Sequence, residues 1–329
     1  MLPTALPSFV PLATILLPFI FPAPASAIVV AARQMLIEAT PLVVAIQDYY
    51  KNDNSSSFVN GLPDIWENTN IDLAAGAEVH VLHDAPTRPD LRVVTTVAEV
   101  YYRIVANKKS NIRTMADLKG KRIGVVPNTT SEYFAYRYLR EVVGLKDGDY
   151  TFVKTLSGLC AVEPCKNGTF PYMLQNGVVD AITAYEPTTE VAIRTIGEDN
   201  AVVFQNNSLY RELSVMYTTK AKLDDPASRK EIVKFLRALN KVQKVFAEQP
   251  SKIWSRVSSI SNNASTEVLE KVWPLTKWSG GLPDDMVDIL FEEDQWIAKD
   301  PALRRGPMSR ATLASHIDPG PYKESLEEE

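Results

Sequence analysis

Two stretches decide the fold: SNIRTMADLKGKRIGVVPNTTSEYFAYRYLREVVG at residues 110–144 and LQNGVVDAITAYEP at residues 174–187. In the first stretch, the apolar residues 123–126 follow a Lys-Gly-Lys turn and run into a polar segment, which predicts a strand that feeds a helix. Thr129 and Glu132 have the spacing of a capping box, and Gly144 stands where a helix ends in a left-handed residue. We therefore predict a helix over residues 130–143, whose free N–H groups point into any cleft above the sheet.

Outward from these stretches, short apolar strands alternate with amphipathic helices. Strands are expected at residues 28–32, 71–75, 91–106, 180–184, 201–204 and 213–218, and helices at residues 41–50, 76–82, 188–196, 229–248 and 284–299. Such alternation is typical of parallel sheets that helices cover on both faces. The sequence therefore predicts an α/β fold.

The N-terminus predicts export. Residues 1–27 contain no charged side chain, residues 10–21 are largely apolar, and Ala25-Ser26-Ala27 is a small-residue cleavage pattern. These features are typical of a secretory signal peptide cleaved after Ala27, and a first buried helix is the alternative interpretation. We expect a secreted, extracellular protein.

Modification sites agree with export. Cys160 and Cys165 are the only cysteines, and in an oxidising compartment a pair this close is expected to close a small disulfide loop. Five Asn-x-Ser/Thr sequons are typical of a secreted glycoprotein of a eukaryote. The sequons lie at Asn54, Asn128, Asn167, Asn206 and Asn263.

Charge and hydropathy exclude two classes of partner. The net charge of −5 leaves no basic footprint for a phosphate backbone, so we expect no nucleic acid to bind. After Ala27 no uncharged apolar run reaches the length of a membrane span, so we expect no stable membrane insertion.

Four stretches resemble the nitrate, sulfonate and taurine class of substrate-binding proteins of ABC transporters, which merges with the thiamine-pyrimidine-synthase-like family. They are NIDLAA at residues 70–75, the run at residues 107–126, LQNGVVDAITAYEP at residues 174–187, and the helix at residues 238–253 with its Gln-Pro-x-Lys step. The third stretch is the most diagnostic. In this family the chain returns to the cleft through Asn-Gly-x-x-Asp-Ala, which is followed by an apolar strand and then by Glu-Pro. We expect a secreted, fungal-like member of this family.

The resemblance implies a two-lobed, periplasmic-binding-protein-like (type II) fold with a ligand cleft between the lobes and hinge closure. After the signal peptide at residues 1–27, lobe one is expected at residues 28–101, lobe two at residues 102–209, and the return to lobe one with the C-terminal helices at residues 210–329. The chain departs from the family between residues 50 and 71, where little remains of a second strand. We expect this strand of lobe one to be missing or irregular.

Candidate ligand-binding residues lie where strands end and helices begin, because ligands of open α/β sheets sit beyond the carboxyl ends of the strands. Backbone N–H and hydroxyl groups at residues 129–131 would donate hydrogen bonds, Tyr185 would stack on a planar ring, and Glu186 or Glu78 would bind a cationic or N–H-bearing group. A glycan at Asn128 would crowd this cleft. The full set is Arg33, Gln34, Glu38, Gly76, Ala77, Glu78, Thr95, Thr96, Asn128, Thr129, Thr130, Ser131, Tyr185 and Glu186.

The competing chemistry is metal binding. His80 and His83 share a helix face and could be joined by Glu78 or Asp84, but His316 is the only other histidine and no spacing fixes an acidic ligand. The acidic run at residues 292–294 is interpreted as a solvated helix face. We expect no metal site and no cofactor.

The leading hypothesis is a secreted, non-enzymatic solute-binding protein that closes around a small polar or anionic molecule: a sulfonate, a nitrate-like anion or a pyrimidine. An enzyme of the thiamine-pyrimidine-synthase or thiaminase-like branch is the first alternative, and it would need Cys160 as a free nucleophile. An extracellular interaction protein that has lost its ligand is the second. The sequence leaves open whether a transporter partner exists.

Overall fold

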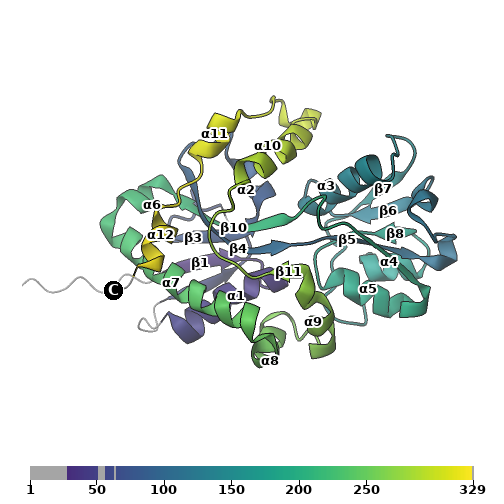
Figure 1. Ribbon diagram of the computed structural model, residues 1–329, viewed down its shortest axis with the longest axis horizontal. Coiled ribbons are helices and arrows are strands. Elements are labelled where there is room, and N and C mark those ends of the chain that lie inside the picture. Colours follow the sequence, from purple (N-terminus) through teal and green to yellow (C-terminus); the bar gives the residue numbers. More distant parts are fainter. Residues whose placement is uncertain (1–27, 51–55, 63, 328–329) are drawn as a thin grey trace, which may run out of the picture.

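The computed structural model describes residues 28–50, 56–62 and 64–327, and it folds into two α/β lobes that lie side by side (Figure 1). The expected signal peptide and the sequon at Asn54 lie outside the described residues. Each lobe has its own sheet and its own buried apolar core. This is the α/β architecture that the sequence predicts.

Lobe one is built on a six-stranded mixed sheet with the order β11-β4-β10-β3-β1-β2. β1 runs parallel to β2 and to β3, whereas β10 runs antiparallel to β3 and to β4. The strands are β1 (Val29–Ala32), β2 (Ser57–Asn60), β3 (Leu73–Ala77), β4 (Leu91–Val100), β10 (Glu212–Thr219) and β11 (Thr276–Lys277).

The expectation that lobe one lacks a regular second strand was wrong. β2 pairs with all four residues of β1 at the edge of the sheet. An edge strand forms hydrogen bonds on one side only and is partly exposed, so four residues with one or two apolar side chains suffice. Lobe one therefore has its second strand even though the segment between residues 50 and 71 is short.

Helices cover both faces of this sheet, as the alternation of its buried side chains requires. Val30 and Ala32 of β1 belong to a core with the helices α1, α7, α8 and α9, whereas Ala31 faces a second core with α2, α10 and α11. The helices of lobe one are α1 (Thr40–Val44), α2 (Glu78–Asp84), α6 (Lys220–Asp224), α7 (Pro226–Glu248), α8 (Pro250–Ile260), α9 (Thr266–Val272), α10 (Met286–Ile297), α11 (Arg310–Ser315) and α12 (Gly320–Leu326).

Lobe two has a five-stranded sheet with the order β7-β6-β8-β5-β9, in which β6, β7 and β8 are parallel. Its strands are β5 (Arg103–Asn107), β6 (Arg122–Val125), β7 (Thr151–Lys154), β8 (Ala181–Ile182) and β9 (Ala201–Gln205). Its helices are α3 (Thr130–Arg137), which continues as a π-helical turn (Tyr138–Val142), α4 (Phe170–Gln175) and α5 (Thr188–Ile196).

Two chain passages join the lobes. Tyr102 lies in the first, between β4 and β5, and Tyr210 lies in the second, between β9 and β10. Their rings stack with centroids 6.3 Å apart, and Tyr102 also stacks on Phe134 of α3 at 5.6 Å. The two passages are therefore packed against each other at the base of the space between the lobes.

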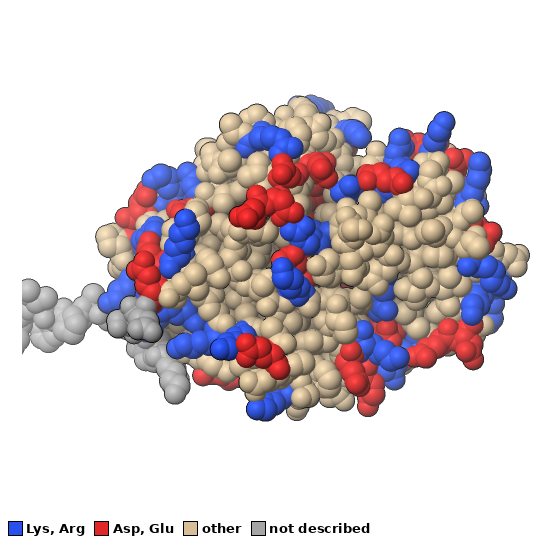
Figure 2. All heavy atoms as spheres, in the orientation of Figure 1, with Lys and Arg blue, Asp and Glu red and all other residues tan. Residues whose placement is uncertain are grey.

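The surface carries mixed charge. Figure 2 shows lysine and arginine interspersed with aspartate and glutamate over the visible face of both lobes. None of the helices in the described part of the chain is both long and apolar enough for a bilayer span.

Candidate functional site

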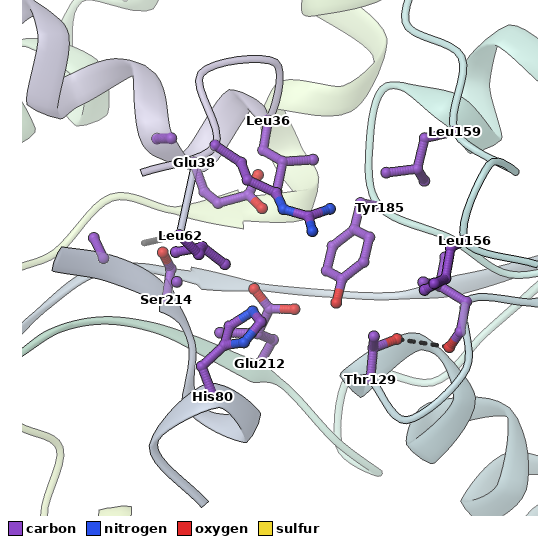
Figure 3. A pocket seen from close by; sticks show the side chains of 16 residues that line it. Leu36, Glu38, Leu62, His80, Thr129, Leu156, Leu159, Tyr185, Glu212 and Ser214 are labelled. Atoms are coloured by element: carbon purple, nitrogen blue, oxygen red, sulfur yellow. Dashed lines mark hydrogen bonds between the residues drawn. The ribbon is translucent and has the colours of Figure 1, made fainter. Parts of the chain in front are cut away.

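A cavity of about 140 Å³ lies between the two lobes, and both lobes supply its walls (Figure 3). The side chains from lobe one include those of Arg33, Leu36, Glu38, Leu62, His80, Glu212 and Ser214. The side chains from lobe two are those of Val126, Thr129, Leu156, Leu159 and Tyr185. A few polar groups thus converge inside a largely apolar wall, which is the usual composition of a small-molecule site.

Strand ends place these groups. Residues 33–38 follow β1, His80 is on the helix that follows β3, Thr129 follows β6, and Tyr185 follows β8. These strands end at the cleft edge of their sheets, so the rule for open α/β sheets describes this site. Glu212 arrives differently, because it begins the antiparallel strand β10, in which Ser214 pairs with Ala77 at the end of β3.

Glu212 is the carboxyl group at the centre of the cavity (Figure 3). Its side chain is 1% exposed, and its Oε2 accepts hydrogen bonds from the hydroxyls of Tyr102 and of Thr130, the latter at 2.7 Å. Its Oε1 is buried without any hydrogen-bond partner. Burial raises the pKa of Glu212, although the two hydroxyl donors oppose this rise.

Glu38 faces Glu212 from the turn after β1 (Figure 3). The residue is 6% exposed, and no other described residue donates a hydrogen bond to its carboxyl group. Burial, and next the nearby charge of Glu212, raise the pKa of Glu38 to about 8. Two carboxyl groups that share a buried site cannot both ionise cheaply, so the pair holds at least one proton at neutral pH.

Two further carboxyl groups lie behind this pair. Glu78 accepts hydrogen bonds from the Tyr210 hydroxyl at 2.7 Å and from the Leu213 N–H at 2.9 Å, and burial raises its pKa to about 8. Glu293 of α10 is completely buried, and burial, followed by the charge of the neighbouring Glu78 and a hydrogen bond with it, raises the pKa of Glu293 well above the ordinary range. The back of the cleft is therefore lined by acids in their neutral form.

This finding corrects the interpretation of residues 292–294 as a solvated helix face. Only Glu292 is exposed, where it pairs with Arg137 at 3.2 Å. Asp294 is fully buried, because its carboxylate binds Arg305 at 2.6 Å and the backbone N–H of Met308. The chain beyond α10 covers Asp294, and Glu293 lies beside Glu78 of α2. Local periodicity reveals neither contact.

Arg33 is the only lysine or arginine among the cavity-lining residues, and it is exposed to solvent. His80 is the other basic group there, and lost hydration together with the charge of Arg33 lowers its pKa to about 4. His80 is therefore neutral at physiological pH, and its ring can donate or accept a hydrogen bond. Gly76 admits this ring, since a Cβ at that position would lie 2.8 Å from His80 Cδ2.

The two histidines of α2 do not form a metal site with their neighbours. His83 Nε2 lies 3.3 Å from the carbonyl oxygen of Asn128, across the mouth of the cleft, whereas His80 faces the cavity. Among residues 28–50, 56–62 and 64–327, no three His, Cys, Asp or Glu side chains are placed to share an ion.

The cavity brings together Arg33, Glu38, Gly76, Ala77, Thr129 and Tyr185 of the residues that the sequence analysis singles out. Thr130 and Glu78 lie one layer behind, in contact with the hydroxyls of Tyr185 and Tyr210. Whether any of these residues binds a ligand stays a prediction.

The remaining candidates are engaged elsewhere. The hydroxyls of Thr95 and Thr96 bond to Gly281 within lobe one, and Gln34 Nε2 donates to the Ile260 carbonyl at 3.3 Å. The Ser131 hydroxyl accepts a bond from the backbone N–H of Val126 at 3.2 Å. These four side chains do not line the cavity, and their polar atoms form hydrogen bonds within their own lobe.

Glu186 also has a structural partner. Its carboxylate accepts a hydrogen bond from Arg103 at 2.9 Å and another from the Thr189 hydroxyl, and Arg103 pairs with Glu190 at 2.8 Å as well. All three charged groups are buried inside lobe two. The cationic partner expected for Glu186 is thus supplied by the protein itself.

The helix start at Thr129 differs in detail from the predicted capping box. Thr129 is the N-cap and its hydroxyl accepts from the Ser131 N–H at 3.3 Å, but the Glu132 carboxylate accepts from the N–H of Asn128. Asn128 has a left-handed φ of +56°, and Lys154 holds Glu132 at 2.6 Å. In a capping box the Glu132 carboxylate would accept from the N–H of Thr129, whereas here it accepts from the N–H of the preceding residue.

Asn128 is exposed and belongs to a second cavity, of about 480 Å³, at the rim of the cleft. A glycan at Asn128 would therefore occupy the rim and not the space between Glu38 and Glu212. The charged groups of this rim cavity are largely paired, with Lys154 on Glu132 at 2.6 Å and Arg140 on Asp147 at 2.9 Å. It is larger than the inner cavity, and ion pairs engage these four charged side chains.

Cys160 and Cys165 form the predicted disulfide, so Cys160 offers no free thiol. The loop that carries them also presents Leu156 and Leu159 to the cavity, and the Cys160 N–H donates to the Thr188 hydroxyl at 3.1 Å. The disulfide thus restrains one apolar wall of the site.

Sequence reasoning missed Glu212, Leu156 and Leu159. Glu212 is the only charged residue in β10, a strand that is almost wholly buried. A single acid in such an apolar strand is a sequence signal for a functional carboxyl group. The two leucines had no signal, because they lie in an irregular loop without periodicity.

Comparison with known proteins supports the assignment of the fold. A model of the family described as NMT1/THI5-like matches residues 59–253. No curated protein sequence matches the chain significantly.

Solved structures share the whole two-lobed arrangement. The aliphatic sulphonate-binding protein SsuA of Escherichia coli is 16% identical, with a TM-score of 0.67 over 89% of this chain and 92% of that chain. The alkanesulfonate-binding protein SsuA of Xanthomonas axonopodis pv. citri, bound to MOPS, is 17% identical, with a TM-score of 0.64 over 90% and 99%. A Candida albicans protein with the generic periplasmic binding protein fold is 17% identical, with a TM-score of 0.57 over 90% and 96%. At these identities the likeness concerns the fold alone.

Proposed function

The chain belongs to the NMT1/THI5-like family, and from this membership and the cavity between its lobes we propose that it is a secreted protein that binds a small polar molecule by closing two lobes around it. The observation that carries the proposal is that both lobes wall one cavity, which is lined by a carboxyl group, that of Glu212, with an unpartnered oxygen. A site of this kind forms only when the lobes come together, so ligand binding and lobe closure are coupled.

The passages between the lobes suit hinge motion. They are two short segments around Tyr102 and Tyr210, and each lobe keeps its own apolar core on either side of them. Rotation at these segments would separate Glu38 and Glu212 on lobe one from Thr129 and Tyr185 on lobe two while leaving both cores intact. Opening would therefore admit a ligand without unfolding either lobe.

The cavity limits the size of the ligand. A buried protein cavity of about 150 Å³ holds one benzene molecule. The space here, of about 140 Å³, therefore suits a molecule of a single small ring or a few heavy atoms. Sulfonates, nitrate-like anions and pyrimidines fall within this size, with Arg33 available to an anionic group and the ring of Tyr185 to a planar one.

Export is part of the proposal. Residues 1–27 have the pattern of a signal peptide, and the Cys160–Cys165 disulfide suits an oxidising compartment. The sequons at Asn128, Asn167 and Asn263 are exposed, and Asn206 is partly so. Glycan attachment at these positions would leave the inner cavity open.

Thermal unfolding of the secreted protein against nitrate, ethanesulfonate, taurine and 4-aminopyrimidine tests this function. A ligand at 100 times its dissociation constant stabilises the native state by about 2.7 kcal/mol, which moves the midpoint by several degrees. Ser214→Leu places a larger side chain in the cavity and should abolish the shift, whereas Ser255→Leu on the exposed face of α8 should preserve it.

Three results would oppose the proposal. A folded protein that no compound stabilises would favour an interaction protein that has lost its ligand. A shift that survives Ser214→Leu would place binding outside the inner cavity. Retention of the protein inside expressing cells, with residues 1–27 intact, would refute secretion.

A further inference from the structure

The Glu212 carboxyl group has one buried oxygen without a hydrogen-bond partner in the described part of the protein, and no other described residue donates a hydrogen bond to the carboxyl group of Glu38. Glu212 is 1% exposed, and its Oε1 has no hydrogen-bond partner although its Oε2 has two. A buried oxygen without a hydrogen-bond partner lowers the stability of the protein unless a bound molecule supplies the missing donor. Figure 3 shows both carboxyl groups directed into the cavity.

Among the residues that the structure describes, no basic group forms an ion pair with either carboxyl group or lowers its pKa. His80 of α2 faces the pair but is uncharged at neutral pH, and Arg33, beyond the end of β1, is exposed. Tyr185 faces the pair from lobe two with a hydroxyl bonded to Thr130, and Glu186, the next acid, is already paired with Arg103. Tyr102 and Thr130 stand behind Glu212 as donors to the other oxygen.

We propose that Glu38 and Glu212 form a subsite for a protonated amine, so that the ligand carries an ammonium group which lies between the two carboxyl groups. This inference rests on the proposed binding function and narrows its ligand to a cationic or amino-bearing molecule. An ammonium group donates three hydrogen bonds, which suits two carboxyl groups that approach from different elements. Arg33 then remains available for an acidic group at the other end of the same molecule.

Binding of the amine is coupled to the release of a proton from the carboxyl pair. In the empty cavity, burial and mutual repulsion keep a proton on the pair at neutral pH. When the ammonium enters, its positive charge lowers the pKa of Glu38, the proton of Glu38 passes to solvent, and the ammonium then lies between two ionised carboxylates. The affinity for an amine should therefore rise up to about tenfold per pH unit between pH 6 and 8, and about one proton should be released per ligand.

Isothermal titration calorimetry with two matched pairs of probes tests the inference: taurine against isethionate, and ethanolamine against ethylene glycol. Each pair exchanges an ammonium group for a hydroxyl of similar size. We expect the amine of each pair to bind at least tenfold more tightly at pH 8. The slope of the affinity against pH, measured in phosphate from pH 6 to 8, counts the protons released.

Variants separate the subsite from the rest of the cavity. Glu38→Gln and Glu212→Gln keep the shape of each side chain and should remove both the preference for the amine and its pH dependence. Glu292→Gln on the exposed face of α10 is the matched control and should change neither. Circular dichroism of each variant establishes that the fold is retained.

The outcomes distinguish this inference from the proposed function. Tighter binding of isethionate than of taurine would refute the amine subsite and leave the binding function standing. An unchanged preference in Glu212→Gln would refute it as well. If none of the four probes bound while nitrate or 4-aminopyrimidine still stabilised the protein, the amine subsite would be refuted and the binding function would stand. If no compound of either panel bound, both would be refuted.

Discussion

Glu38→Gln should flatten the dependence of the protein's stability on pH. Folding raises the pKa of Glu38 from an ordinary value of 4.5 to about 8, so between these values the folded protein holds a proton that the unfolded chain releases. The stabilisation linked to this proton is complete below pH 4.5, and it is lost as the pH rises to about 8. Glutamine is neutral at every pH and has no such dependence.

The size of the effect follows from the shift. Each pKa unit corresponds to about 1.4 kcal/mol, and the interval from pH 5 to pH 8 lies almost wholly between the two pKa values. The wild-type protein should therefore lose about 3 kcal/mol more stability over this interval than Glu38→Gln does. Glu78, whose pKa is raised in the same way, keeps a slope of its own in both proteins.

Urea unfolding of the ligand-free protein, followed by tryptophan fluorescence at pH 5, 6, 7 and 8, measures this difference. Glu292→Gln removes an exposed carboxylate from the same protein and should leave the wild-type slope unchanged. Parallel stability curves for wild type and Glu38→Gln would refute the reasoning, because Glu38 would then ionise as an ordinary surface acid does.

Three further predictions concern residues that hold the lobe-two side of the site in place. Arg103→Met leaves the two carboxylates that bind this guanidinium buried and unpaired, so the free energy of unfolding should fall by about 3–5 kcal/mol in urea titrations; a loss below 1 kcal/mol would contradict a buried ion pair. Removing the disulfide in Cys160→Ala/Cys165→Ala should lower stability by about 2 kcal/mol, as expected for a short loop, and a Tm equal to that of wild type would contradict it. Gly158→Ala adds a Cβ only 2.3 Å from the Phe170 ring and should cost about 1–3 kcal/mol, whereas an unchanged midpoint would show that the loop yields freely.

Much of the fold follows from local sequence pattern. The helix expected at residues 188–196 is α5 (Thr188–Ile196), and the long amphipathic stripe at residues 229–248 lies within α7 (Pro226–Glu248). Both succeed because each buries one apolar face against a sheet, which the 3.6-residue period reports directly. Short elements do worse, as β2 and α4 show, since four to six residues hold too few positions for a period.

The site was harder to predict because it depends on tertiary contacts. The strand-end rule finds Glu38, Thr129 and Tyr185, which follow parallel strands, but it overlooks Glu212 at the start of an antiparallel strand. It also selects Glu186, whose partner Arg103 lies 83 residues earlier in the sequence and reaches it only in the folded lobe. Sequence alone identifies the edge of the sheets at which the cavity lies, whereas the pairing of charges decides which acids remain free.

A crystal structure of the protein with the probe that stabilises it most would test the central claim most directly. We predict ligand density in the inner cavity, between Glu38 and Glu212 on one side and Tyr185 on the other, with both lobes in contact with the ligand. Density in the rim cavity beside Lys154 and Trp296, with the inner cavity unchanged, would contradict the claim.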